Sequence, residues 1–370
     1  MTRKKKVMIA AASIVCVIII ALCILLIAAA IVGRELKVNP SRKLDGVDQE
    51  VQDALWYSSI AANSHNTQMW RVELYPDLSR LLITVDGSRT LSVVDPKRRE
   101  AYISLGCYIE TMSAAFDAYG YDTHVQCGDL SVQVSYSRRD NATVDNSRLA
   151  LIDKRHTDKS GYHSDRIKQD AVSRLLNKYA ALSIYQSDSD SFTYLKQASM
   201  DAVALQSADR AYREELAQWM RFSDKEALDK LDGITADMIG LKGVVKAFYY
   251  WTTTRESAKG DKFARQGIAT AKSQLDNCGA FAVITGGNTF EELIDVGRIT
   301  QAFWFDCADN DIAVQPFSAA LETEPFSLSI DNDLGLDAPI QMILRLGYVD
   351  SYGVNSGLRR SLSDYIDVIR

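Results

Sequence analysis

The pattern of apolar and polar positions begins with an unbroken apolar run, from Val7 to Val32, that contains no charged residue. About 20 such residues are enough to cross a bilayer as a helix. A cleaved signal sequence usually has a shorter apolar core, of roughly 7–15 residues. The pattern therefore predicts an uncleaved, single-pass anchor in the cell membrane.

Basic residues flank this run on both sides, and their placement bears on its orientation. Residues 3–6 are all basic and precede it, whereas Arg34, Lys37, Arg42 and Lys43 are spread out after it. Basic residues near the ends of a span favour the cytoplasmic side, and here the two totals are nearly equal. Because the upstream group is contiguous, we expect a short cytoplasmic tail and a domain outside the cytoplasm.

After a polar tether of residues 34–46, segments with the helical period alternate with segments of the strand period. Asp95 and Pro96 form a helix start signal, and Gly120 is a stop signal. Residues 222–262 are charged and irregular, which indicates an insertion or a lid. The expected helices span residues 47–62, 96–119, 166–179, 192–220 and 290–310, and the expected strands span residues 70–74, 81–85, 130–136, 182–186, 281–285 and 340–348.

Two helix-to-strand units of the chain resemble each other weakly, and this similarity is called the weak echo below. Residues 104–106 lie within one expected helix and residues 295–297 within another, and placing Gly106 on Gly297 superposes the elements. Identities between the two units are few. Either an internal repeat or the chance similarity of two common units explains the echo.

Composition narrows the classes of function. Hydrophobic residues make up 47% of the chain and the net charge is −6, with no basic face beyond the first residues, which argues against nucleic acid as a partner. The four histidines do not have the spacing of metal ligands, so we expect no metal site. Cys107, Cys127, Cys278 and Cys307 form no CxxC pair. They are either buried thiols or disulfide-bonded, and the sequence does not choose between these states.

Four short motifs, in order along the chain, resemble those of FMN-dependent nitroreductases. The segment Ser64–Trp70 (SHNTQMW) resembles their SxNxQPW segment, with Met69 in place of the usual Pro. Residues 95–100 (DPKRRE) and 104–107 (SLGC) resemble the Acg-type branch of FMN-binding oxidoreductases, and residues 344–348 (LRLGY) resemble the closing strand of the superfamily. The resemblance covers about residues 47–350.

The resemblance implies an α+β fold in which two nitroreductase-like lobes are fused into a pseudo-dimer, with central mixed sheets flanked by helices. Because the lobes are fused, no oligomer is required for a complete site. The implied division is a tail and anchor at residues 1–33, a tether at 34–46, a first lobe at 47–150, and a second lobe at 151–370 that carries the insertion or lid at about 222–262.

The resemblance also implies one FMN site per chain, shared between the lobes. Nitroreductases carry an arginine-rich phosphate motif before the SxNxQ segment, but here the matching stretch comes after residue 150. Taken without the family, the same residues also fit roles as surface charges, helix caps and turn formers. The implied phosphate contacts are Arg155, Thr157, Lys159 and Arg345, and the implied contacts to the ring or ribitol are Ser64, Asn66 and Gln68.

A further family feature is a backbone N–H after a proline that faces N5 of the flavin. The matching stretch contains Pro316, Phe317 and Ser318, with the N–H of Ser318 as the candidate and Phe317 next. An ordinary loop is the alternative. No catalytic side chain is expected, because the flavin itself performs the chemistry.

The implied function is that of a membrane-anchored, FMN-dependent oxidoreductase. Electrons would pass from NAD(P)H, or another donor, through FMN to a nitro compound, a quinone or a similar small acceptor. A lid formed by residues 222–262 would instead favour a flavin-binding or flavin-sequestering protein with little turnover. A third alternative is a structural or interaction domain that has lost FMN.

Overall fold

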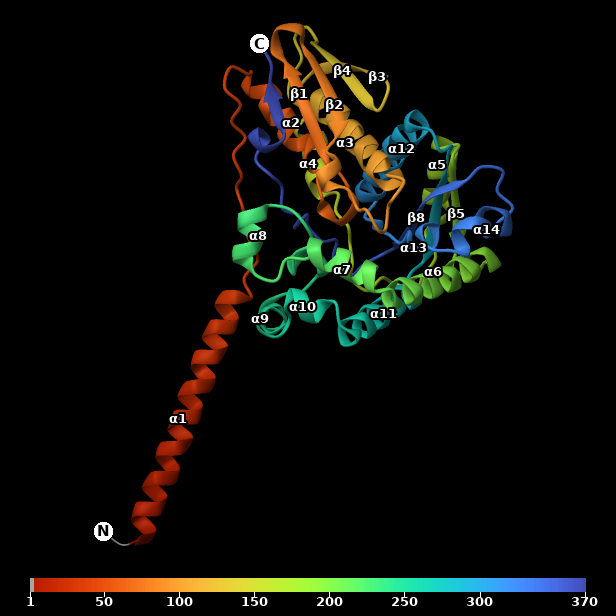
Figure 1. The fold of residues 1–370 in the computed structure, drawn as a ribbon. Helices are drawn as coiled ribbons and strands as arrows, with labels where there is room; N and C mark the ends of the chain where they lie inside the picture. The colour runs from red at the N-terminus through yellow and green to blue at the C-terminus, as the bar shows by residue number, and fades with distance from the viewer. Residues whose placement is uncertain (1–2) are drawn as a thin grey trace.

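The apolar N-terminal run forms a helix that projects away from the rest of the chain in the computed structural model, which describes residues 3–370 (Figure 1). This helix, α1, spans Arg3–Val32. Its segment Ala12–Val32 has a mean hydropathy of 3.5 and is almost entirely exposed. The helix is therefore long and apolar enough to cross a membrane. Residues 1 and 2 of the expected cytoplasmic tail lie outside the described residues.

The first of two sheets is built mainly from consecutive strands of the first half of the chain. Its order is β3-β4-β2-β1-β9, antiparallel except where β9 lies parallel to β1. In β1, every second residue is buried while the intervening ones are more exposed, which is typical of a sheet with one covered face. The strands are β1 (Trp70–Tyr75), β2 (Arg80–Val85), β3 (Tyr121–Cys127), β4 (Ser131–Arg138) and β9 (Ile366–Val368).

The second sheet belongs to the second half of the chain and is antiparallel throughout, in the order β5-β6-β8-β7. Its central strands are almost continuously apolar and buried, because helices cover both faces. The strands are β5 (Leu182–Gln186), β6 (Ala280–Thr285), β7 (Ala313–Pro316) and β8 (Ile340–Gly347).

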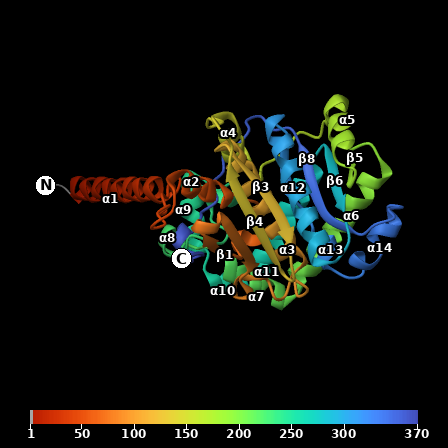
Figure 2. The ribbon, with the colours of Figure 1, turned by 90° about the horizontal axis from the view of Figure 1, so that it is seen from above.

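Two long helices, α3 (Arg99–Ala118) and α12 (Phe290–Asp309), lie between the two sheets (Figure 2). Each helix contributes to the core of the other half, since Ile103 of α3 packs in the second core and Ile294 and Phe305 of α12 pack in the first. The fold is thus α+β, with two sheets flanked by helices and one apolar N-terminal helix, as the sequence predicted.

The crossing of α3 and α12 is closest where Gly106 faces Gly297. A Cβ added at Gly106 would lie 2.1 Å from the carbonyl oxygen of Ile294, and one added at Gly297 would lie 2.0 Å from that of Ile103. Each carbonyl belongs to the residue three positions before the opposite glycine, so the contact is reciprocal. Only glycine permits backbones to approach this closely.

The remaining helices cover the sheets and form one end of the molecule. They are α2 (Gln49–Ser58), α4 (Asn146–Lys154), α5 (Gln169–Lys178), α6 (Asp190–Ala208), α7 (Arg210–Trp219), α8 (Asp224–Lys230), α9 (Gly243–Thr252), α10 (Arg255–Ala258), α11 (Asp261–Asp276), α13 (Ala319–Glu322) and α14 (Phe326–Asp333). Short 3₁₀ turns are η1 (Ser64–Asn66), η2 (Pro76–Leu78), η3 (Gly87–Arg89), η4 (Asp237–Ile239) and η5 (Leu362–Asp364).

Three expectations about elements need correction. The helix expected from Pro96 begins at Arg99, although the Asp95 carboxylate still accepts from the amide of Ala101 at 2.9 Å. The single helix expected over 192–220 is divided into α6 and α7 at Asp209. Residues 222–262, expected to be irregular, are largely helical. In addition, β9 places the end of the chain in the first sheet, although the sequence division assigned it to the second lobe.

Candidate functional site

A cavity of about 490 Å³ lies where the two halves of the chain meet. This volume falls within the range of roughly 300–1,000 Å³ that small-molecule and cofactor sites occupy. The walls come from η1 and α3 of the first half, from the loop after α4, from α7 and α11, from α12 and the end of β7, and from the C-terminal segment that contains Arg359. Segments from the whole length of the chain therefore build one site.

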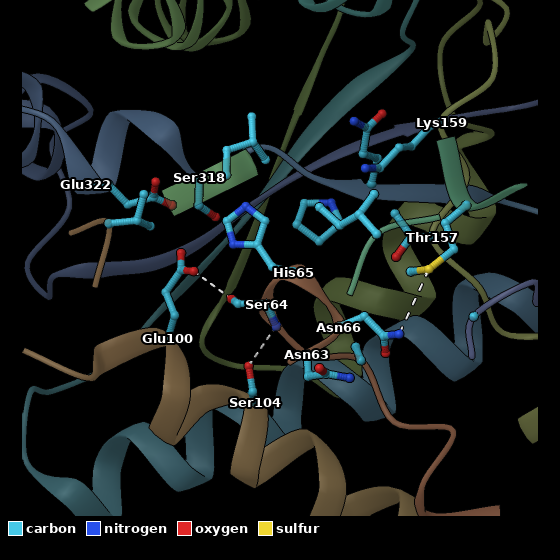
Figure 3. A pocket seen from close by; sticks show the side chains of 18 of the residues that line it. Asn63, Ser64, His65, Asn66, Glu100, Ser104, Thr157, Lys159, Ser318 and Glu322 are labelled. Carbon is cyan, nitrogen blue, oxygen red and sulfur yellow. Dashed lines mark hydrogen bonds between the residues drawn. The ribbon is translucent and has the colours of Figure 1, made fainter. Parts of the chain in front are cut away.

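The segment of residues 61–66 enters the cavity on a constrained backbone. His65, Asn66 and Gln68 all have positive φ, at 49°, 53° and 51°. Non-glycine residues rarely adopt this conformation, and clusters of it occur at functional sites. His65 is central in the cavity (Figure 3), and burial lowers the pKa of its imidazole, which is therefore neutral at neutral pH.

The polar side chains of the SxNxQ-like segment make protein contacts. Ser64 Oγ donates to Glu100 Oε2 at 2.6 Å. Asn66 Nδ2 donates to the carbonyls of Gly233 and Leu358, both at 3.1 Å, and Asn66 Oδ1 accepts from Arg359. Asn66 therefore joins the insertion and the C-terminal segment at the wall of the cavity.

A cationic group from the loop after α4 forms one side of the cavity. Arg155, Thr157 and Lys159 all line it, and Figure 3 shows Thr157 and Lys159 on the same side of His65. Burial lowers the pKa of Arg155 to about 10, so its guanidinium is charged at neutral pH, and burial also lowers the pKa of Lys159. Neither side chain has a carboxylate at ion-pair distance within residues 3–370.

Arg155 keeps donor capacity that the protein does not use. Its Nη2 donates to the carbonyl of Ile60, whereas its buried Nε has no partner among the described residues. The guanidinium lies 5.1 Å from the ring centroid of Trp304. A buried cation without a counter-charge is unfavourable, and an anion bound at this position would relieve that cost.

Arg359 is a second buried cation in the wall, and the sequence reasoning did not identify it. Its guanidinium donates to Asn66 Oδ1 at 2.9 Å, to the carbonyl of Ile60 at 3.0 Å and to that of Leu358 at 2.7 Å. Burial, and next the nearby Arg155, lower its pKa to about 9. Because its donors are engaged by carbonyls, Arg359 fixes the wall and adds positive potential.

Three of the expected site residues lie outside the cavity lining. Arg345 is fully buried, with its guanidinium 3.6 Å from the ring centroid of Tyr162 and donating to the carbonyls of Gln274 and Ser160 at 2.6 and 2.9 Å. Gln68 donates to the carbonyl of Leu231 at 2.9 Å. Phe317 packs in a hydrophobic core. The structure thus gives these residues structural contacts and does not bring Arg345 to Arg155.

The end of β7 reaches the cavity as expected for the stretch after Val314. Pro316 and Ser318 line the cavity together with Gln315. The amide of Phe317 donates to the carbonyl of Ile343 at 2.8 Å, which fixes the turn after the strand. Ser318 is buried and shares this side of the site with Glu322 (Figure 3).

Several polar atoms around the cavity are buried without a hydrogen-bond partner in the described part of the chain. Such atoms are uncommon in folded proteins, and each requires an explanation. Donors and acceptors are both represented, so one polar ligand with both kinds of group would satisfy the set. The atoms are His65 Nδ1, Arg155 Nε, Arg213 Nε, Trp304 Nε1, Gln315 Oε1 and Ser318 Oγ.

Two carboxyl groups from different halves meet on the side of the cavity opposite Lys159 (Figure 3). Glu100 on α3 and Glu322 on α13 lie close enough for each carboxyl group to shift the pKa of the other. Burial, and next the charge of Glu100, raise the pKa of Glu322 well above its ordinary value. Burial would also raise the pKa of Glu100, but the nearby Arg99, Glu322 and Ser64 outweigh it and lower that pKa. Glu322 is therefore the carboxyl group of this pair that is more readily protonated.

Glu100, Glu322 and His65 were not identified from the sequence. Glu100 is the last residue of the DPKRRE motif, and His65 lies within the SHNTQMW segment. Both residues therefore belong to motifs that the sequence did reveal, although neither was assigned to the site. Glu322 lies on a one-turn helix that no periodic pattern indicated. Arg359 follows the stretch covered by the resemblance, and only the return of the chain to the first sheet brings it to the site.

Comparison with known proteins gives a likeness in general fold. No family model and no curated protein matches this chain. Among solved structures, it is similar to a nitroreductase-like family protein from Bacillus cereus, with 13% identity and a TM-score of 0.32, over 63% of this chain and all of that one. It is also similar to the FMN-dependent nitroreductase NfnB from Mycobacterium smegmatis in complex with NADPH, with 15% identity and a TM-score of 0.39, over 61% of this chain and all of that one.

Both structures are named as nitroreductases or as nitroreductase-like, and the sequence motifs of this chain resemble those of nitroreductases. Neither bears on the Acg-type branch or on the fusion of two lobes. Both TM-scores are below 0.5, and the likeness is limited to the general fold.

Proposed function

We propose that the chain is a membrane-anchored flavoprotein that binds FMN in the cavity between its halves and acts as an oxidoreductase. The supporting observation is the pairing of uncompensated cations with unpartnered polar atoms in one cavity. A phosphate carries a charge of about −1.5 to −2 near neutral pH. It would match Arg155, Thr157 and Lys159 in charge and in donors.

The residues fit the rest of FMN as well. The edge of the isoalloxazine ring carries both hydrogen-bond donors and acceptors. The unpartnered atoms of His65, Gln315 and Ser318 also include both kinds and could therefore pair with it. When bound, FMN would supply hydride and electron transfer, and the protein would position it and exclude water. Asn66 and Arg359 would hold the wall of the site, and Glu322 would hold a proton beside it.

The spectrum of the purified full chain in detergent tests this proposal. We expect flavin absorption bands, and release on denaturation of one FMN per chain, because only one phosphate-type motif and one SxNxQ-type segment occur in the sequence. Two flavins per chain, from absorbance and protein mass, would contradict the single site. A colourless protein that does not take up added FMN would instead support an interaction domain without a cofactor.

The electron acceptor we propose is a quinone, a nitro compound or a similar small molecule, with NAD(P)H or another donor supplying electrons. The proposed location of the domain is outside the cytoplasm. That location favours a donor other than NAD(P)H, because NAD(P)H is scarce outside the cytoplasm.

A flavin-sequestering function is the second candidate, and one observation favours it. Ile234, Met238, Ala258 and Phe263, from within and just after the insertion, line the cavity. A wall of this kind restricts access to a bound ring. We expect the dithionite-reduced protein to be reoxidised by a small quinone or nitroarene faster than free FMN is. Reoxidation no faster than that of free FMN would favour sequestration over reduction.

A further inference from the structure

Helix α9 has its polarity inverted with respect to an ordinary surface helix. Its only charged side chain, that of Lys246, is fully buried, whereas Val244, Val245, Phe248 and Trp251 are 58%, 60%, 63% and 46% exposed. Positions 244, 248 and 251 follow the spacing of one helical face. An ordinary surface helix turns such a face to the core, but here it has no covering element among residues 3–370.

The buried Lys246 holds α9 in this orientation. Its Nζ donates to Asp237 Oδ2 at 2.7 Å and lies 3.1 Å from Asp224 Oδ1. It also donates to the carbonyl of Arg34 at 2.8 Å, just past the end of α1. A buried ammonium group with these partners is costly to turn outward, so the outward apolar face is a fixed feature of the fold.

The start of α9 is fastened to the end of the proposed membrane anchor. The amide of Gly243 donates to the carbonyl of Gly33 at 3.0 Å. A Cβ at Gly33 would lie 2.2 Å from the carbonyl oxygen of Gly243, so the two backbones touch. In Figure 1, α9 is seen nearly end-on beside the end of α1, and the two helices therefore run crosswise.

The position of α9 matches the surface of a bilayer that contains α1. The apolar segment Ala12–Val32 has 21 residues, about 30 Å of helix, which is the thickness of the hydrocarbon core. The hydrocarbon therefore ends beside Gly33, at the level of Gly243. The nearby Arg34, Lys37 and Lys242 are exposed and suit the headgroup layer.

We infer that the exposed face of α9 is embedded in the membrane interface, next to the anchor. The occupant of this face is lipid: apolar side chains and Trp251 enter the boundary between headgroups and acyl chains, as interfacial helices do to a depth of roughly 5–10 Å. The inference rests on the proposed anchoring of the chain and is independent of the bound cofactor.

Fluorescence quenching in liposomes with brominated acyl chains tests this placement with the full chain. Phe248→Trp is made in a Trp251→Phe background, and Leu328→Trp in the same background is the matched control. Leu328 is 70% exposed on α14, and α14 lies far from α1 in both ribbon views (Figures 1 and 2). The Trp251→Phe protein alone supplies the signal of the other tryptophans.

We expect loss of the added emission and a blue shift for Phe248→Trp, and neither change for Leu328→Trp. Flotation of each variant with the liposomes is measured in parallel. If the protein floats but the tryptophan at 248 is not quenched, the inference is wrong while the anchoring stands, and a protein partner or a second copy would cover the face. Failure to float would overturn both the anchoring and the inference.

Discussion

Arg155 is the residue through which the cofactor assignment can be tested most directly. A charge-assisted hydrogen bond contributes about 1.5–3 kcal/mol, and 1.4 kcal/mol corresponds to a tenfold change. We therefore expect Arg155→Ala to weaken FMN binding about 10- to 150-fold by titration. Riboflavin lacks the phosphate, so its affinity should change little.

Arg174→Ala is the matched control, because Arg174 is an exposed arginine in the same half whose partners are Asp170 in the preceding turn and Asn310. It should leave both affinities unchanged. If Arg155→Ala folds normally and weakens FMN and riboflavin equally, then the guanidinium does not bind the phosphate. Unchanged affinity for FMN would remove Arg155 from the site.

The raised pKa of Glu322 predicts a dependence of stability on pH. The pKa of Glu322 is raised in the folded state, so its contribution is complete below about 4.5 and is lost as pH rises through the folded pKa. In that interval the free energy of unfolding should fall by about 1.4 kcal/mol per pH unit from this group. Glu322→Gln keeps a donor to Glu100 and should lack this decline.

Denaturant midpoints measured from pH 4.5 upward for the wild type and for Glu322→Gln check this expectation. The two profiles should diverge toward alkaline pH, with the variant more stable. Glu100, whose pKa is lowered, acts in the opposite direction, and its contribution is lost as pH falls. Parallel profiles over the whole range would show that the pKa of Glu322 is not raised in the folded state.

The positions of single site residues were only partly predictable from the sequence. Arg155 and Ser318 were identified through local motifs, and both line the cavity. Arg345 belongs to a motif too, but its side chain turns to Tyr162 and nearby carbonyls. Which way a buried side chain turns depends on packing partners far away in the chain, and a motif does not contain them.

At the scale of elements, the contact of α3 with α12 gives a sharp test of packing. A methyl group at Gly106 or at Gly297 would overlap a backbone carbonyl of the other helix. Overpacking of this kind typically costs about 1–3 kcal/mol. Gly106→Ala and Gly297→Ala should each lower the free energy of unfolding by this amount in denaturant titrations.

Gly267→Ala is the matched control for these two variants. Gly267 lies in α11, and a Cβ there would meet no atom within 4 Å. Alanine is favoured over glycine inside helices by about 0.5–1 kcal/mol, so this change should be neutral or stabilising. If all three variants lost the same stability, helix propensity or the unfolded state would explain the effect, and the close crossing would not.

Elements with a regular apolar period were predicted well, and those that depend on a single polar contact were not. The strand Leu182–Gln186 was predicted with its observed bounds. The break at Asp209 was missed because its carboxylate accepts from the amide of Ala211 at 2.7 Å and starts a new helix. In α9 the buried lysine and exposed apolar face invert the usual pattern, which concealed the helix.

At the scale of the whole molecule, the orientation in the membrane is the first prediction. From the contiguous basic residues 3–6 we expect the tail in the cytoplasm and residues 34–370 outside. A protease added to intact cells with an exposed surface should therefore digest the domain, while a cytoplasmic marker protein stays intact. Protection of the domain until the cells are lysed would reverse the orientation.

The two-lobed division was read from motifs, and the structure adds a reciprocal feature to it. Gly106 and Gly297, which the weak echo aligned, contact each other across α3 and α12. A two-fold interface would produce reciprocal contacts of this kind, and the fusion of two lobes stays a prediction from the motifs. The course of the C-terminal segment was beyond prediction, because β9 pairs with a strand that lies far from it in the sequence, as in the pair Val72 and Ile366.

The glycine crossing also has a genetic consequence. In a symmetric dimer of identical chains, one codon specifies both glycines of such a contact, so a single mutation alters the crossing twice. Here Gly106 and Gly297 are separate codons of one gene. Either glycine can therefore mutate without the other, and a change at one position can be compensated by a different change at the other. Two halves joined in this way are free to become unlike while the interface between them persists.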